Sequence, residues 1–243
     1  MVSSCGDSND DGPTTPPEPD IYTASANLHN HVVGDGTVDT QMSFRQGEAI
    51  NLANHIVPGG VALDRGLLLD DPSQISGIEM FLTGGEGTVL NPGDEFSLER
   101  DRRYVFIALG NLAVGSGQLR PHIVQLDALS EPGSGKVVFR FTHALAGSPD
   151  PVDVYVNGEV ARNLAFAQSS PEIEFDARGA DEDTLIIVAT GVIPDGSNEI
   201  YRVEGGTLFQ SGLDYEAVLG HRPRNGFNGD INGRLGLYLS EAH

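Results

Sequence analysis

The stretch Lys136-Val-Val-Phe-Arg-Phe-Thr-His-Ala-Leu-Ala-Gly-Ser-Pro-Asp-Pro-Val-Asp-Val-Tyr-Val-Asn-Gly158 decides the fold class of this chain. Residues 137–141 are rich in β-branched and aromatic side chains, which favour strands. A Gly/Ser/Pro/Asp cluster at 146–151 predicts a turn. Valines at 152, 154 and 156 then alternate with other residues, as in a half-buried strand, and Asn157-Gly158 is a hairpin signal. The stretch predicts strand, turn, strand.

Composition extends this prediction to the whole chain. The 243 residues include 31 glycines and 14 prolines, which disfavours long helices and favours a turn-rich all-β protein. The formal net charge is −21, so nucleic-acid phosphates would meet an acidic surface, and we expect no nucleic-acid partner. The single cysteine, Cys5, excludes an intrachain disulfide.

The first 20 residues are predicted to be a disordered tether. Val2-Ser3-Ser4-Cys5 is similar to the end of a bacterial lipobox, whose cysteine becomes acylated, and the next 15 residues hold four prolines and no large apolar side chain. The charged and apolar regions of a signal peptide are missing ahead of Cys5. A chance cysteine near a disordered start is the alternative. We predict a bacterial cell-envelope protein, held at the outer membrane or cell surface by an acyl anchor at Cys5.

Beyond the tether the chain divides into two parts of similar size. We predict a first β-sandwich at residues 21–130, a linker at 131–135, where Glu-Pro-Gly-Ser-Gly stands, and a second β-sandwich at 136–243. Seven or eight short strands in each part favour two tandem immunoglobulin-like antiparallel β-sandwich domains.

Matching residues recur at offsets of 110 to 114 along the chain. His31 pairs with His143, and Tyr104 pairs with Tyr215. Val38-Asp39 likewise pairs with Val152-Asp153. Offsets that stay so nearly constant indicate an internal duplication of about 110 residues.

Eight strands are predicted in each repeat. In the first they are Tyr22–His31, Val38–Phe44, Ile50–His55, Val61–Leu69, Ile75–Leu82, Glu95–Leu98, Tyr104–Leu109 and Ile123–Leu129. In the second they are Val137–Ala144, Val152–Val156, Arg162–Ala167, Glu172–Asp176, Thr184–Ala189, Glu199–Val203, Tyr215–Leu219 and Arg234–Leu239. Residues 64–71 could form one helical turn instead.

The same residues carry a resemblance to a known family. Phe139-Arg-Phe-Thr-His143-Ala, followed by Pro149-Asp-Pro-Val-Asp153-Val-Tyr-Val-Asn-Gly158, is similar to the signature of the domain of unknown function 4397 family. Tyr104-Val-Phe-Ile-Ala-Leu-Gly110 resembles its closing strand. The resemblance implies secreted or cell-envelope β-sandwich domains, often in tandem and often on bacterial lipoproteins. It lends no catalytic residue.

Two histidines form a candidate metal site. His29 and His31 lie two positions apart on a predicted strand and so share a face. Pairs of imidazoles presented in this way bind metal in several proteins, and Asp35, Asp39 or His55 would complete the ligand set.

A structural role for the histidines is the alternative, and the repeat favours it. The second repeat has Phe141 and His143 at the places of His29 and His31, so one histidine is replaced by a core-type residue. We therefore predict that His31 and His143 each bond the backbone of the turn that follows.

Further repeated positions complete the predicted structural signature. A carboxylate at Asp39 or Asp153 can cap the N–H groups of a turn or pair with an arginine such as Arg140. Tyr104 and Tyr215 begin a late strand, where a tyrosine hydroxyl can form a corner with upstream backbone.

The sequence contains no catalytic motif of the common kinds, neither a Gly-x-Ser-x-Gly elbow nor a His-Glu-x-x-His, Cys-x-x-Cys or phosphate-binding loop. We predict a non-catalytic envelope lipoprotein without a cofactor. It would act in adhesion, scaffolding or ligand binding, with an envelope protein or a polysaccharide as its partner. The alternative is a metal-binding protein or metal-dependent hydrolase that uses His29 and His31.

Overall fold

The computed structural model describes residues 22–34, 41–46, 50–69, 78–82, 89–90, 98–111, 119–146, 150–179, 181–205, 208–221 and 235–241. The regular elements in these ranges are strands, apart from one short 3-10 turn at Leu126–Ala128. The predicted all-β class is therefore confirmed. No helix in these ranges is long and apolar enough to cross a lipid bilayer.

The described strands form four sheets of four strands each. We call β3-β2-β5-β6 the first outer sheet, β4-β1-β7-β8 the first inner sheet, β12-β9-β15-β16 the second inner sheet and β11-β10-β13-β14 the second outer sheet. The strands of the first half are β1 Tyr22–Val33, β2 Met42–Gln46, β3 Ile50–Ile56, β4 Val61–Leu69, β5 Ile78–Leu82, β6 Val89–Leu90, β7 Arg103–Asn111 and β8 Arg120–Gln125. Those of the second half are β9 Lys136–His143, β10 Val152–Val156, β11 Glu159–Leu164, β12 Ile173–Asp176, β13 Thr184–Ala189, β14 Glu199–Glu204, β15 Asp214–His221 and β16 Leu235–Glu241.

Both halves follow one strand order. The first strand of each half lies between the fourth and the seventh, and the second lies between the third and the fifth. The first and seventh strands run parallel in both halves, whereas the other described pairs are antiparallel. A parallel neighbour needs a long crossover, which the intervening strands supply. An immunoglobulin domain keeps its strands A, B, E and D in one sheet, so this sandwich has a different strand order.

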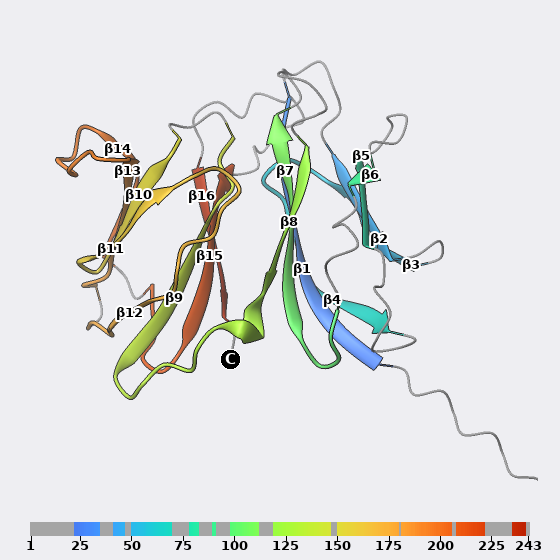
Figure 1. The fold of residues 1–243 in the computed structure, drawn as a ribbon, viewed down its shortest axis with the longest axis horizontal. Helices are drawn as coiled ribbons and strands as arrows, with labels where there is room; N and C mark the ends of the chain where they lie inside the picture. Colours follow the sequence, from blue (N-terminus) through green and yellow to red (C-terminus); the bar gives the residue numbers. More distant parts are fainter. Residues whose placement is uncertain are drawn as a thin grey trace, which may run out of the picture.

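The four sheets stack as layers, with the two inner sheets facing each other in the middle (Figure 1). Each half has its own apolar core between its inner and outer sheet. A third group of buried side chains, which we call the central cluster, contains residues of both halves. Its buried members are Val105, Ile107, Leu109, Val124, Leu126, Leu129, Val138, Ala144 and Val218.

Strand β7 shows why the inner sheets read as nearly continuous apolar runs. Tyr104 and Phe106 point into the first core, while Val105 and Ile107 point into the central cluster. Successive side chains of a strand face opposite sides. Because both sides of the inner sheet are covered, both sets of side chains are apolar.

The stretch Lys136–Gly158 folds into β9 and β10, and the two strands lie in different sheets. Its valines at 152, 154 and 156 point into the second core, as the alternation predicts. Asn157 and Gly158 have φ values of 48° and 98° and join β10 to β11 by a two-residue turn. The hairpin signal in the sequence is thereby confirmed.

The strand predicted at Val61–Leu69 is confirmed as β4, which pairs with β1, so the alternative helical turn does not form at residues 64–69. A prediction at the end of the first half was wrong. The strand predicted over Ile123–Leu129 ends at Gln125 and gives way to the 3-10 turn. In this turn Leu126 and Leu129 reach the central cluster, and the Leu129 N–H bonds the Leu126 carbonyl at 3.0 Å.

Candidate functional site

The predicted metal pair is buried between the two inner sheets. The rings of His29 and His31 have centroids 5.7 Å apart and are tilted by 47°. Burial lowers the pKa of His29 to about 3, so its ring is neutral at physiological pH. His55 is exposed on the first outer sheet, and Cys5, Asp35 and Asp39 lie outside the described residues. Among the described side chains, no group of three His, Cys, Asp or Glu is arranged to hold a metal ion.

The hydrogen bonds correct the sequence pairing of His31 with His143. The His143 Nδ1 accepts from the Leu145 N–H at 3.4 Å, which is the turn bond predicted for it. In the first half, Asn30 makes the equivalent bond, because its Oδ1 accepts from the Val32 N–H at 2.9 Å. Strand register agrees, since Asn30 lies beside Ala108, four residues after Tyr104, and His143 lies beside Leu219, four residues after Tyr215. The counterpart of His143 is therefore Asn30.

His31 therefore does not lie on the face of its inner sheet that is equivalent to the face His143 occupies in the second inner sheet. A shift of one residue turns every side chain of a strand to the opposite face. His29 and His31 face the second inner sheet, at the places that Thr142 and Ala144 occupy in the second half. The two inner sheets approach each other closely at Gly220 of β15, where an added Cβ would lie 2.2 Å from the His31 ring.

Asp153 caps two loops on the outward face of the second outer sheet. Its carboxylate accepts from the N–H groups of Asn163 at 2.8 Å and Gly191 at 3.1 Å, and from the Thr190 hydroxyl at 2.9 Å. Arg162 lies 3.4 Å from it. Burial acts to raise the pKa of Asp153, but these bonds and the Arg162 charge outweigh it and lower the pKa below its ordinary value.

Of the two roles predicted for Asp153, the capping of N–H groups is confirmed, whereas Arg140 is not its arginine partner. Arg140 lies on β9 and faces the first inner sheet, whereas Asp153 faces away from the second core on β10. Two layers therefore separate the side chains, and Arg140 binds Glu216 instead.

Tyr104 and Tyr215 make the same hydrogen bond in the two halves. The Tyr104 hydroxyl accepts from the Glu99 N–H at 2.7 Å, and the Tyr215 hydroxyl accepts from the Gln210 N–H at 3.0 Å. Each bond spans five residues back along the chain. This is the geometry of a tyrosine corner.

A chain of hydrogen bonds lies where the inner sheets meet. Arg140 Nε donates to Glu216 Oε2 at 2.6 Å, and Thr142 Oγ1 donates to Glu216 Oε1 at 2.5 Å. The Thr142 and Ser169 hydroxyls are 2.6 Å apart, and Ser169 Oγ lies 3.0 Å from His122 Nε2. We call these five side chains the interface network.

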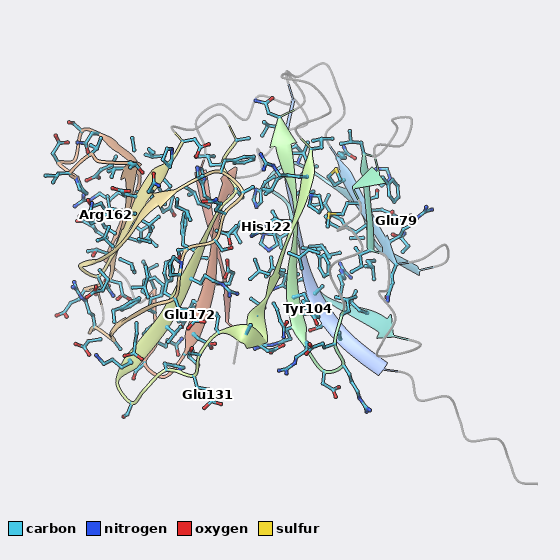
Figure 2. The ribbon with its side chains drawn as sticks, in the orientation of Figure 1. Glu79, Tyr104, His122, Glu131, Arg162 and Glu172 are labelled. Carbon is cyan, nitrogen blue, oxygen red and sulfur yellow. The ribbon has the colours of Figure 1, made fainter. Side chains whose placement is uncertain are left out.

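The interface network ties one half to the other. His122 belongs to β8 of the first half, and the other four residues belong to the second half; Figure 2 shows His122 between the inner sheets. Arg140 Nη2 also donates to the Gln125 carbonyl of β8 at 3.0 Å. Nearby, the Arg120 guanidinium lies over the Phe166 ring, 5.4 Å from its centroid.

Two ionisable groups of the interface network, Glu216 and His122, have shifted pKa values. Burial raises the pKa of Glu216 to about 7, and the Arg140 charge and the bonds from Thr142 and Arg140 oppose that rise. Burial lowers the pKa of His122, and the charges of Arg140 and Arg120 lower it further. Both shifts favour the neutral form of the group.

Sequence reasoning missed Glu216, His122 and Ser169. A signal was present, because Glu216 interrupts the apolar run of β15 at the place where β7 carries Val105. A lone carboxylate inside a strand buried on both faces requires a partner. The sequence contained the partner, Arg140, but not the fact that β9 and β15 are neighbours.

The arrangement can store a proton and relay it. Ser169 and His122 are at the distance of a nucleophile and its base, but the Ser169 hydroxyl is also bonded to Thr142, which donates to Glu216. The hydroxyls thus link a titratable group at one end to a titratable group at the other.

No protein-family model and no curated protein sequence matches this chain. Among solved structures, the fimbrial anchor protein Mfa2 from Porphyromonas gingivalis is similar over 91% of this chain and 99% of that chain, at 7% identity and a TM-score of 0.21. At this TM-score the likeness carries no argument about the fold or the function of this chain.

Proposed function

We propose that this protein is a non-catalytic module of the bacterial cell envelope, acylated at Cys5, in which two sandwiches act together as one scaffold for adhesion or ligand binding. The observation that carries the proposal is the central cluster. Its buried side chains come from both inner sheets, so the halves share a core in addition to having one each. A shared apolar core favours one body over two independently moving domains.

The sequence supports the envelope location. Cys5 follows a lipobox-like tripeptide, and the next 15 residues have the composition of a flexible tether. The two repeats resemble a family that is common on bacterial lipoproteins. The equal strand order of the two halves supports their origin by duplication.

The partner in this proposal is an envelope protein or a polysaccharide bound by loops at the ends of the sandwiches. Loops on a rigid framework are the usual place for binding residues. With a net charge of −21, the chain favours a basic partner surface, and its association rate should fall as salt screens the attraction.

Intact-mass analysis of the protein from the membrane fraction of its own cells tests the proposal. We expect a mass increased by acyl chains on the fragment that contains Cys5. The matched control is Cys5→Ser. This variant should be absent from the membrane fraction, and its thermal stability should equal that of the unsubstituted protein. An unacylated native protein in the cytoplasm would contradict the proposal.

A further inference from the structure

The interface network has a direction. Each hydroxyl carries a single proton, so Thr142 can donate to only one partner at a time, and so can Ser169. When Thr142 donates to an ionised Glu216, Ser169 must donate to Thr142, and His122 Nε2–H must donate to Ser169. Every donor in the chain then points toward the carboxylate.

The opposite direction satisfies the same groups. A protonated Glu216 donates to Thr142, Thr142 donates to Ser169, and Ser169 donates to an unprotonated Nε2 of His122. The two arrangements differ by one proton, which leaves Nε2 of His122 and arrives at Glu216. Starting from an imidazolium and a carboxylate, the transfer produces a neutral imidazole and a neutral carboxyl group.

The interface network lies where the two inner sheets meet, which we call the joint. Its two ends differ in solvent exposure. Glu216 and Thr142 are fully buried, whereas His122 and Ser169 are partly exposed and form the end nearest to solvent. Strand β7 contributes apolar residues to this face. The register neighbour of Glu216 on β16 is Ser240. The other titratable or charged residues that strand register places on the facing surfaces are Lys136 and Arg140 on β9, Glu174 and Asp176 on β12, Asp214 on β15, Arg103 on β7, Arg120 on β8, and His29 and His31 on β1, and Asp127 of the 3-10 turn is paired with Arg103.

We propose that the joint between the sandwiches is a proton-compensated latch, in which Glu216 takes up a proton as His122 gives one up when the inner sheets dock. Docking then buries a neutral acid and a neutral base. Arg140 keeps its charge, remains partly exposed, and stays bonded to the Gln125 carbonyl of the other half. The result is a joint that stays closed at mildly acidic pH.

The signs of the two titrations oppose each other. Glu216 has a raised pKa, so its contribution to docking is fully present below its ordinary pKa of 4.5 and is lost as the pH rises through about 7. His122 has a lowered pKa, so its contribution is present above its ordinary pKa of 6.5 and is lost as the pH falls. His29 acts in the same sense as His122. Removing Glu216 should therefore expose the acid sensitivity of the histidines.

Thiol labelling of the full chain measures how often the joint opens. In a Cys5→Ser background, Ala144→Cys places a thiol in the central cluster, and Ala217→Cys places one in the second core; both alanines are fully buried. Exposed Ala128→Cys corrects for the effect of pH on the thiol itself. The labelling rate of Ala144→Cys reports joint opening, and that of Ala217→Cys reports opening of the sandwich.

Adding Glu216→Gln should make docking more sensitive to acid. Between pH 8.5 and pH 6, we expect the corrected Ala144→Cys rate to rise about tenfold more with Glu216→Gln than without it, as a shift from 4.5 to about 7 requires. The Ala217→Cys rate should change equally in both backgrounds. An equal pH response of Ala144→Cys in the two backgrounds would overturn the proposal, and so would a matching extra rise at Ala217→Cys.

A carbon-13 NMR titration of the unsubstituted protein tests the proposal even if the variants fail to fold. The Glu216 carboxyl signal should titrate near pH 7, and the His122 ring should titrate below its ordinary pKa of 6.5. A Glu216 midpoint in the ordinary carboxylate range would refute the latch.

Discussion

The two inner sheets share one strand order but carry different chemistry on the faces that meet. Strand register shows three equivalent positions that carry a polar or charged residue in the second half and a different residue in the first. The pairs are Arg140 with Asn27, Thr142 with His29, and Glu216 with Val105. A docking face must complement the surface it touches, not its own copy. The two halves therefore share a strand order although their docking faces differ.

The largest expected effect comes from giving the second sheet the residues of the first. Arg140→Asn alone leaves Glu216 buried without its guanidinium, and we expect it to lower the free energy of unfolding by about 3–5 kcal/mol at pH 8.5. Adding Glu216→Val should recover most of that loss, because it removes the unpaired charge. Urea unfolding curves of both variants measure this. A double variant as unstable as the single one would show that the pair is not the cause.

A smaller effect is expected where the two sheets approach most closely. Gly220→Ala would place a methyl group against the buried His31 ring, and such overpacking costs about 1–3 kcal/mol. The matched control is Gly66→Ala, whose added Cβ would meet nothing within 4 Å. Denaturant midpoints of the two variants should differ clearly, and equal midpoints would mean that the sheets can separate without strain.

The acid response separates His143 from its counterpart Asn30. Burial lowers the pKa of His143 to about 4, with Asp150 opposing the shift, so its contribution to stability is lost as the pH falls below 6.5. His143→Asn copies the residue of the first half and cannot titrate. Relative to pH 8, the wild type should lose about 2 kcal/mol at pH 5 that the variant keeps. Thermal unfolding at both pH values tests this, and parallel losses would contradict it.

The smallest effect should be the same in both halves. Tyr104→Phe and Tyr215→Phe each remove one hydroxyl acceptor from a backbone N–H, at a cost of about 1 kcal/mol. Tyr155→Phe on the outward face of β10 serves as the control and should change stability by less than about 0.5 kcal/mol. A tyrosine corner that mattered in one half alone would show that the two repeats are stabilised differently.

Much of the fold could be predicted because a strand is indicated by the pattern of its own residues. All eight strands predicted for the second half overlap a strand of the structure, and Val152–Val156 and Thr184–Ala189 match at both ends. Alternation of valine with polar residues places side chains on a face without any knowledge of the partner strand. The register between the two halves was harder to predict. His31 and His143 stand in similar sequence contexts, and this similarity led to their being aligned with each other. A shift of one residue preserves the pattern and reverses the face.

The sequence by itself determined the strands, the Asn157-Gly158 turn and the separation of the chain into two similar halves, because each depends on neighbours a few residues apart. Only the tertiary structure decided that Asn30 is the counterpart of His143 and that the two inner sheets meet face to face. It also decided the partner of Arg140, which lies 76 residues away, and joined His122 to Ser169 across 47 residues. Bonds between distant positions depend on strand order, and strand order is set by the burial of whole faces.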